Sequence, residues 1–293
     1  MSSAVLAVGC GLVVPTASAA PVNACAPATA AVETPAVLPV LDWSENVGYD
    51  VEGNLWVSRI YRNEVQRYDR SGTLTGSVPV EFPGAVRLGP DGLLYVVYGD
   101  SPTSALRPGG VVRFDPAAVA PTPEVFVSGL SSMPNGAAFD ADGDLYIGSM
   151  GGLLRVRRDG TLDTEWNARA AVPGANGVVA QGRSLYVTAN GADFGQLLRV
   201  SIDDPADRSL LARLPSPVAS LPNFADDLVI APDGILSIAT LAGQLVRVDP
   251  STGATCTVLT TQPMTALVAV PGAPDQLLAS TEGGDVLRIT LPH

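Results

Sequence analysis

One sequence pattern recurs six times along the chain, and this repeat constrains the fold more than any other feature. Each copy reads as an apolar strand, a turn and a second apolar strand. The copies begin at Glu45, Gly84, Asn135, Asn176, Asp226 and Thr265. The second-strand leucines, from Leu55 to Leu277, follow one another at intervals of 39 to 51 residues. Four short strands in about 40 to 45 residues are typical of a propeller blade, so each copy predicts one blade.

Turn signals support an all-β assignment. Asp-Gly pairs at 91–92, 142–143 and 233–234 suit tight hairpins, because glycine adopts the positive φ that these turns require. A third strand follows most copies, as in QLVRVDP, which ends at Pro250. Residues 36–293 divide into six units of about 43 residues, which predicts one domain, a six-bladed β-propeller with four-stranded blades around a central channel. We expect residues 20–35 to form a linker or N-terminal arm, and Val37–Leu41 to close the ring by pairing with the last blade.

The first 19 residues resemble an export signal. An apolar run from Val5 to Val14 leads to Ala17-Ser18-Ala19, a pattern that suits signal peptidase, so we expect cleavage near Ala19 and a secreted or periplasmic protein. No basic residue precedes the run, and the alternative is an unstructured apolar tail. The stretch is too short to span a bilayer, and no later run approaches about 20 apolar residues, so we expect no membrane partner.

Three cysteines occur, and Cys10 falls in the expected leader. The remaining two, Cys25 and Cys256, form an even pair in an oxidising compartment. A disulfide between them and two free thiols are both open interpretations, because a sequence does not give the distance between two residues.

Composition excludes several functions. All 17 basic residues are Arg, the net charge is −12, and the sole histidine is His293 at the end of the chain. Nucleic-acid affinity comes mainly from clustered basic residues, so we expect no nucleic-acid partner. A lysine Schiff base, a buried histidine base and a His-rich zinc site lack their residues. Carboxylate, amide and hydroxyl chemistry remains.

Oxygen donors occupy four of the six repeat starts: Glu45, Asn135, Asn176 and Asp226. In a propeller the starts of the innermost strands meet at one mouth of the central channel. Carboxylate and amide oxygens there would suit Ca²⁺, or with other geometry Mg²⁺ or Mn²⁺, whereas Zn²⁺ would lack its usual His and Cys ligands. The alternative is that Asn and Asp serve as turn formers, which does not account for Glu45.

With these residues the chain from about Leu41 onward resembles the senescence-marker-protein/gluconolactonase family. The resemblance rests on Glu45 four residues before Tyr49, on Asn-Gly at 135–136 and 176–177, and on Asp226 leading to Pro-Asp-Gly at 232–234. It implies a six-bladed propeller that hydrolyses lactones with one divalent ion. It further implies that Glu45, Asn176 and Asp226 bind the metal and that Asn135 faces the substrate.

Two positions depart from the family pattern. Asp227 replaces a usual glycine, and Met133 stands where members that act on sugar lactones carry arginine. A mouth with Met133, Phe194, Phe224 and Leu241 nearby in sequence would favour a more apolar ester or lactone, although Phe224 and Leu241 could equally be packing residues.

The function we expect is metal-assisted hydrolysis of a small-molecule lactone or ester by a monomer, with Asp226 as the base that activates water. Candidate substrate contacts besides Asn135 and Met133 are Arg107, in a long loop at 99–110, and Asp193, in the segment 190–196. One alternative is a secreted propeller that binds a ligand or partner without catalysis. Another is a propeller enzyme of a different reaction type, such as a synthase or lyase.

Overall fold

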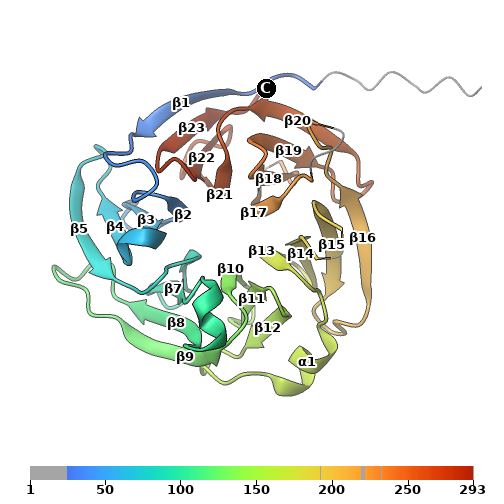
Figure 1. Ribbon diagram of the computed structural model, residues 1–293, viewed down its shortest axis with the longest axis horizontal. Helices are drawn as coiled ribbons and strands as arrows, with labels where there is room; N and C mark the ends of the chain where they lie inside the picture. The colour runs from blue at the N-terminus through green and yellow to red at the C-terminus, as the bar shows by residue number, and fades with distance from the viewer. Residues whose placement is uncertain (1–24, 192, 219–221, 232, 293) are drawn as a thin grey trace, which may run out of the picture.

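The computed structural model describes residues 25–191, 193–218, 222–231 and 233–292. The expected leader, residues 1–19, lies outside these ranges. Over the described ranges the strands form six antiparallel sheets, arranged as blades around a common axis (Figure 1). The predicted six-bladed β-propeller is therefore confirmed. No helix in this part of the chain is long and apolar enough to cross a bilayer.

Within blades 1 to 5 the strands follow chain order outward from the axis. Blade 1 contains β2 (Ser44–Tyr49), β3 (Leu55–Arg59), β4 (Glu64–Tyr68) and β5 (Leu74–Pro79), and blade 2 contains β6 (Val86–Leu88), β7 (Leu94–Tyr98), β8 (Gly109–Phe114) and β9 (Glu124–Leu130). Blade 4 contains β13 (Ala175–Gln181), β14 (Ser184–Ala189), β15 (Gln196–Ser201) and β16 (Arg208–Arg213), and blade 5 contains β17 (Ala225–Ile230), β18 (Leu236–Thr240), β19 (Gln244–Val248) and β20 (Thr255–Thr260). Short 3-10 helices at Ile60–Arg62 (η1) and Pro102–Ala105 (η2) follow the second strands of blades 1 and 2.

Blade 3 departs from the expected four strands. Its sheet contains β10 (Pro134–Phe139), β11 (Leu145–Ser149) and β12 (Gly152–Val156), and after it the chain makes one isolated bridge and enters α1 (Thr164–Arg169). Asp163 caps this helix by accepting a hydrogen bond from the backbone N–H of Trp166. The indole of Trp166 is buried and donates to the carbonyl of Ile202 in blade 4 at 2.8 Å. This buried anchor favours a helix where the other blades have an outer strand.

The strand that closes the ring lies earlier in the chain than expected. Blade 6 contains β21 (Met264–Ala269), β22 (Gln276–Thr281) and β23 (Val286–Thr290), and its outermost strand is β1 (Thr29–Thr34). The propeller therefore begins within the segment that we expected to be a linker, and not at residue 36. Residues 37–41 do not pair with the blade, because the backbone N–H groups of Val37 and Leu38 both donate to Asp42 Oδ2 and fold the segment into a turn.

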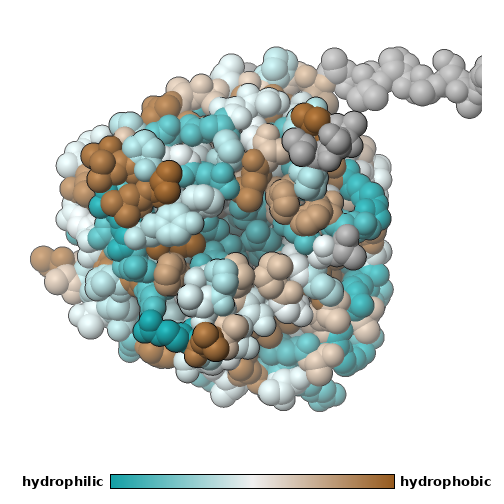
Figure 2. Space-filling view, viewed as in Figure 1, coloured by the Kyte–Doolittle hydropathy of each residue, from teal (hydrophilic) through white to brown (hydrophobic). Residues whose placement is uncertain are grey.

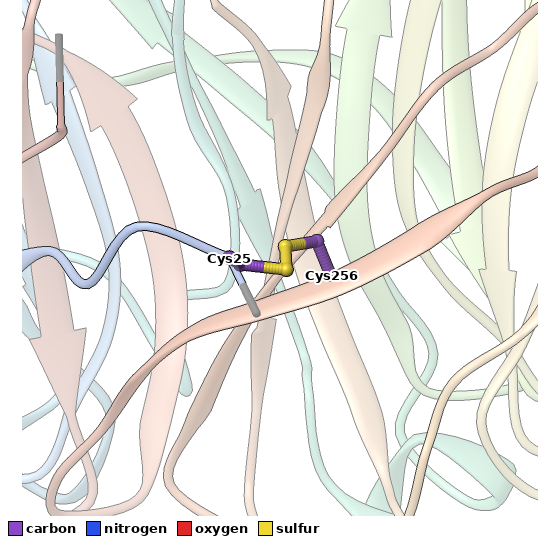
Figure 3. Close-up of a disulfide and its surroundings, with 2 residues drawn as sticks. All are labelled: Cys25 and Cys256. Atoms are coloured by element: carbon purple, nitrogen blue, oxygen red, sulfur yellow. A yellow bond between two sulfur atoms is a disulfide. The ribbon is translucent and has the colours of Figure 1, made fainter. Parts of the chain in front are cut away.

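A disulfide fastens this closure. Cys25 precedes β1 and is bonded to Cys256 of β20, with 5.9 Å between the Cα atoms (Figure 3). Next to it, the backbone N–H of Ala28 donates to the carbonyl of Val258 at 2.8 Å. The N-terminal segment is thus attached to blade 5 by the disulfide and to blade 6 by β1.

The hydrophobic core lies between adjacent blades. One cluster joins Tyr146 and Leu153 of blade 3 to Leu185 and Val187 of blade 4, all of them fully buried. Similar clusters join the other neighbouring blades. Because apolar side chains on both faces of a sheet are removed from water, the innermost strands are held at fixed positions around the axis.

Candidate functional site

The innermost strands of five blades each contain a β-bulge where they begin. The register with the second strand shifts between Ser44 and Asn46, Pro134 and Ala137, Ala175 and Val178, Ala225 and Leu228, and Met264 and Ala266. The residues within these shifts are the predicted ones: Glu45, Asn135, Asn176, Asp226 and Thr265. A bulge frees a side chain from the alternation of the strand and redirects it, so these five residues need not follow the in–out pattern of their strands.

Glycines allow the blades to approach closely at this level. A Cβ on Gly148 would lie 2.1 Å from the carbonyl oxygen of Asn176, and one on Gly136 would lie 2.4 Å from the same atom. A Cβ on Gly177 would lie 2.6 Å from the Cα of Asp227. The glycine that follows each asparagine in the Asn-Gly pairs is therefore required by the contact with the next blade.

Glu45 lies at the centre of a network of hydrogen bonds from three blades. Its Oε2 accepts from Trp43 Nε1 at 2.7 Å and its Oε1 accepts from Asn135 Nδ2 at 2.9 Å. The same amide nitrogen donates to Asp100 Oδ2 at 2.8 Å. Glu45 and Asp100 are both buried. The structure therefore brings Glu45 and Asn135 together and adds a second carboxylate from blade 2.

Asp100 was missed as a site residue. It follows β7, a second strand that runs antiparallel to the innermost strands and so ends at the mouth where they begin. Its position in the long loop at 99–110 was the one sequence feature that could have indicated a role at the mouth. The comparison of repeats did not identify it, because the other blades have no acid at the equivalent position.

Asn176 and Asp226 contribute two oxygens without partners. Asn176 Oδ1 and Asp226 Oδ1 are buried and accept no hydrogen bond from any described residue. A buried oxygen without a donor costs about 1–3 kcal/mol, so atoms of this kind require an explanation. A hard cation is one partner that satisfies carboxylate and amide oxygens together. The donor set therefore fits the divalent ion that the sequence predicted.

Burial and mutual repulsion raise the pKa values of the acids at this mouth. Burial raises the pKa of Asp226, and the charges of Glu45 and Asp227 raise it further. The pKa of Asp100 is raised well above its usual range, first by burial and then by Glu45. Burial also raises the pKa of Glu45, although hydrogen bonds from Asn135 and Trp43 oppose the rise. Concentrated negative charge in a buried place would be relieved by a cation.

Over the described ranges, no group of three or more His, Cys, Asp or Glu side chains is arranged to hold a metal ion. The expected ligand set contains only two carboxylates, from Glu45 and Asp226, with the amide of Asn176 as the third donor. Figure 2 shows that the centre of the ring is hollowed and that hydrophilic residues line the hollow.

The predicted substrate contacts separate into two groups. Met133 precedes Asn135 by two residues, and its backbone N–H donates to Ser104 Oγ at 2.9 Å; its contact with a substrate stays a prediction. Arg107 instead pairs with Glu81 at 3.5 Å, with both side chains mostly exposed. Asp193 pairs with Arg213 at 3.0 Å, also in the solvent. Neither Arg107 nor Asp193 is brought to the cluster around Glu45.

A salt bridge crosses the axis next to the cluster. Arg87 of β6 pairs with Asp227 of β17, on the opposite side of the ring. Asn46 of blade 1 donates to Asp227 Oδ2 at 2.9 Å and accepts from Arg87 Nη1 at 2.6 Å. Arg87 Nε donates to the carbonyl of Ala137 in blade 3 at 2.7 Å. Four blades thus share one network, and the Asp227 that departs from the family pattern is its fully buried acid.

Comparison with solved structures places this fold among known propellers. A regucalcin from Agrobacterium tumefaciens, described as a calcium-binding protein, shares 17% identity over 92% of this chain and 96% of its own, with a TM-score of 0.71. A gluconolactonase from Xanthomonas campestris shares 16% identity over 93% and 99%, with a TM-score of 0.68. A PQQ-bound aldose sugar dehydrogenase from Streptomyces coelicolor shares 19% identity over 90% and 98%, with a TM-score of 0.67. No protein-family model and no curated protein matches the chain. At these identities the similarity establishes the fold.

Proposed function

We propose that this protein is a hydrolase of lactones or esters that depends on a divalent cation, most simply Ca²⁺. The observation that carries the proposal is the pair of buried oxygens without partners, Asn176 Oδ1 and Asp226 Oδ1, at the mouth that also holds the Glu45 carboxylate. The similarity to a gluconolactonase and to a calcium-binding regucalcin supports the same class.

Glu45, Asn176 and Asp226 would hold the cation, which supplies Lewis acidity toward the substrate carbonyl and stabilises negative charge that develops on its oxygen. Asp226 also acts as the base: the carboxylate oxygen that does not hold the cation takes a proton from the attacking water. When the acyl–oxygen bond breaks, the same proton passes to the alkoxide oxygen of the opened ring or leaving group.

We also propose that the protein acts outside the cytoplasm. The apolar segment that ends at Ala19 and the bonded pair Cys25 and Cys256 support this location, since disulfides persist mainly in oxidising compartments. The proposed partner is a small neutral molecule that enters the mouth.

The test is an assay of the chelator-stripped protein on γ- and δ-lactones and aryl esters, with Ca²⁺, Mg²⁺, Mn²⁺ or Zn²⁺ added back. We expect the cation to restore hydrolysis, and Asp226→Asn to lower kcat/KM by about 10²–10⁴-fold. Asp142→Asn is the matched control, because Asp142 lies at the other end of β10 with 70% of its side chain exposed. Hydrolysis by the stripped protein, or by Asp226→Asn at the wild-type rate, would contradict the proposal.

A further inference from the structure

The mouth that holds the cluster is surrounded by exposed apolar side chains. We call Tyr61, Leu106, Met150, Phe194 and Phe224 the apolar rim; each is between 37% and 89% exposed. The first four lie in the loops after the second strands of blades 1 to 4, and Phe224 lies just before β17. All five therefore belong to the face on which the innermost strands begin.

Aspartates recur in the turns on the opposite face. Asp50, Asp69, Asp91, Asp140 and Asp233 lie in the turns between strands there, and each accepts a hydrogen bond from a backbone N–H of its own turn. Exposed apolar residues also occur on this face, at Val51 and Val119, but no aromatic pair of the kind formed by Phe194 and Phe224 is found among the exposed residues there in the described part of the chain. Clustered exposed apolar residues around a polar hollow are typical of a binding site for a small molecule.

Two members of the rim, one from blade 4 and one that precedes β17 of blade 5, pack against each other and form a wall. The rings of Phe194 and Phe224 pack together with 4.5 Å between their centroids. Asn190 fastens both segments, because its Oδ1 accepts from the backbone N–H groups of Gly195 and Ala225, each at 3.1 Å. Its Nδ2 donates to the carbonyl of Ala225 at 2.7 Å. Both segments of the wall are therefore fixed without a ligand, and Phe224 precedes the proposed ligand Asp226 by two residues in the sequence.

The charges at this face disfavour an anionic ligand. Arg62 pairs with Asp42, Arg107 with Glu81 and Arg213 with Asp193, so each of these arginines already has an acidic partner. Blade 6 contributes another acid, Glu282, in the turn that follows β22. Acids therefore outweigh available cations around the hollow in the described part of the chain.

We propose that the substrate is an uncharged lactone or ester with an alkyl or aryl substituent that packs against Phe194 and Phe224. This inference rests on the proposed hydrolase function and names its substrate class. A polyhydroxylated sugar lactone would place hydroxyl groups against aromatic carbon, where they lose their hydrogen bonds to water. An apolar substituent is instead removed from water by the same surface.

The test is a series of γ-lactones that differ only in chain length: γ-butyrolactone, γ-valerolactone, γ-octalactone and γ-decalactone, with glucono-δ-lactone beside them. In the calcium-loaded protein we expect kcat/KM to rise by about two- to fourfold for each added methylene that contacts the wall. Phe194→Ser with Phe224→Ser should lower the ratio of kcat/KM for γ-decalactone to that for γ-butyrolactone by about tenfold or more. Val119→Ser, at a 98% exposed apolar residue outside the rim, should leave the ratio unchanged.

The inference would be overturned by equal kcat/KM values along the γ-lactone series, by a preference for glucono-δ-lactone, or by an unchanged ratio in the double variant. Each of these results would leave the hydrolase function intact. Absence of hydrolysis for every lactone would overturn the proposed function instead. In that case calorimetric titration with γ-decalactone tests whether the wall binds an apolar lactone. Binding to the wild-type protein that is lost in the folded double variant supports the inference. Absence of binding to the wild-type protein overturns it. Circular dichroism confirms that the double variant is folded.

Discussion

At the scale of single residues, the contact between Gly148 and Asn176 determines where one expected ligand lies. Because a Cβ at position 148 would come within 2.1 Å of the Asn176 carbonyl oxygen, Gly148→Ala should displace that backbone. We expect the affinity for Ca²⁺ to fall about tenfold or more, as when groups that position metal ligands are removed. Calcium titration measures the effect. Gly76→Ala is the control, because its nearest non-neighbouring atom lies 3.8 Å from the added Cβ; equal affinities in the two variants would contradict the prediction.

The Arg87–Asp227 pair gives a second prediction. Asp227 is fully buried, so Asp227→Ala leaves the Arg87 charge near the axis without its acid, and we expect the free energy of unfolding to fall by about 3–5 kcal/mol. Urea denaturation measures this change. Arg87→Met combined with Asp227→Ala should cost less than the sum of the two single variants. Strict additivity would show that the pair does not interact.

Sequence reasoning identified the residues that repeat and missed those that do not. Glu45, Asn135, Asn176 and Asp226 share one position in the repeat, and the topology of a propeller places that position at the axis. Asp100 and Arg87 have no counterparts in other blades, so their roles depend on which side chains meet across the ring. Arg107 and Asp193 were predicted from loop position alone, and solvent-exposed partners hold them away from the cluster.

At the scale of elements, closure of the ring depends on β1 and its disulfide. Cys25→Ser with Cys256→Ser removes a link between residues 231 positions apart, and chain-entropy reasoning predicts a loss of about 2–5 kcal/mol. Chemical denaturation of the variant and the oxidised wild-type protein measures this loss. The reduced wild-type protein should match the variant, and equal stability of all three would contradict the prediction.

The order and type of the strands were predictable, because alternating apolar runs and Asp-Gly turns are local signals. The closing strand was not, since Thr29–Thr34 and Val37–Leu41 both contain residues that favour strands. The choice is made by Asp42, whose carboxylate accepts two backbone N–H groups and turns residues 37–41 away from the sheet. The outer part of blade 3 was likewise decided by a tertiary contact, the burial of Trp166.

At the scale of the whole molecule, the cluster of acids couples stability to pH. Burial raises the pKa of Asp226 in the folded protein, so its contribution is favourable below the pKa of an unfolded aspartate, about 4, and is lost as pH rises through the folded value. In EDTA, Asp226→Asn should therefore gain stability relative to the wild-type protein as pH rises from about 5 to 8. Excess Ca²⁺ should reverse the difference, because it binds the folded wild-type protein.

Denaturant unfolding at several pH values, with and without Ca²⁺, measures both differences. Asp142→Asn provides the reference, since that exposed acid lies on the opposite face and its curve should run parallel to the wild-type curve. The prediction would be contradicted if the free energy of unfolding of Asp226→Asn changed with pH in parallel with that of the wild-type protein.

Calorimetric titration of the chelator-stripped protein with Ca²⁺ tests most directly whether one cation is bound by Glu45, Asn176 and Asp226. The proposal predicts binding of one ion per chain, loss of that binding in Glu45→Gln and in Asp226→Asn, and unchanged binding in Asp142→Asn. Absence of binding to the wild-type protein, or the same affinity in all three variants, would contradict it.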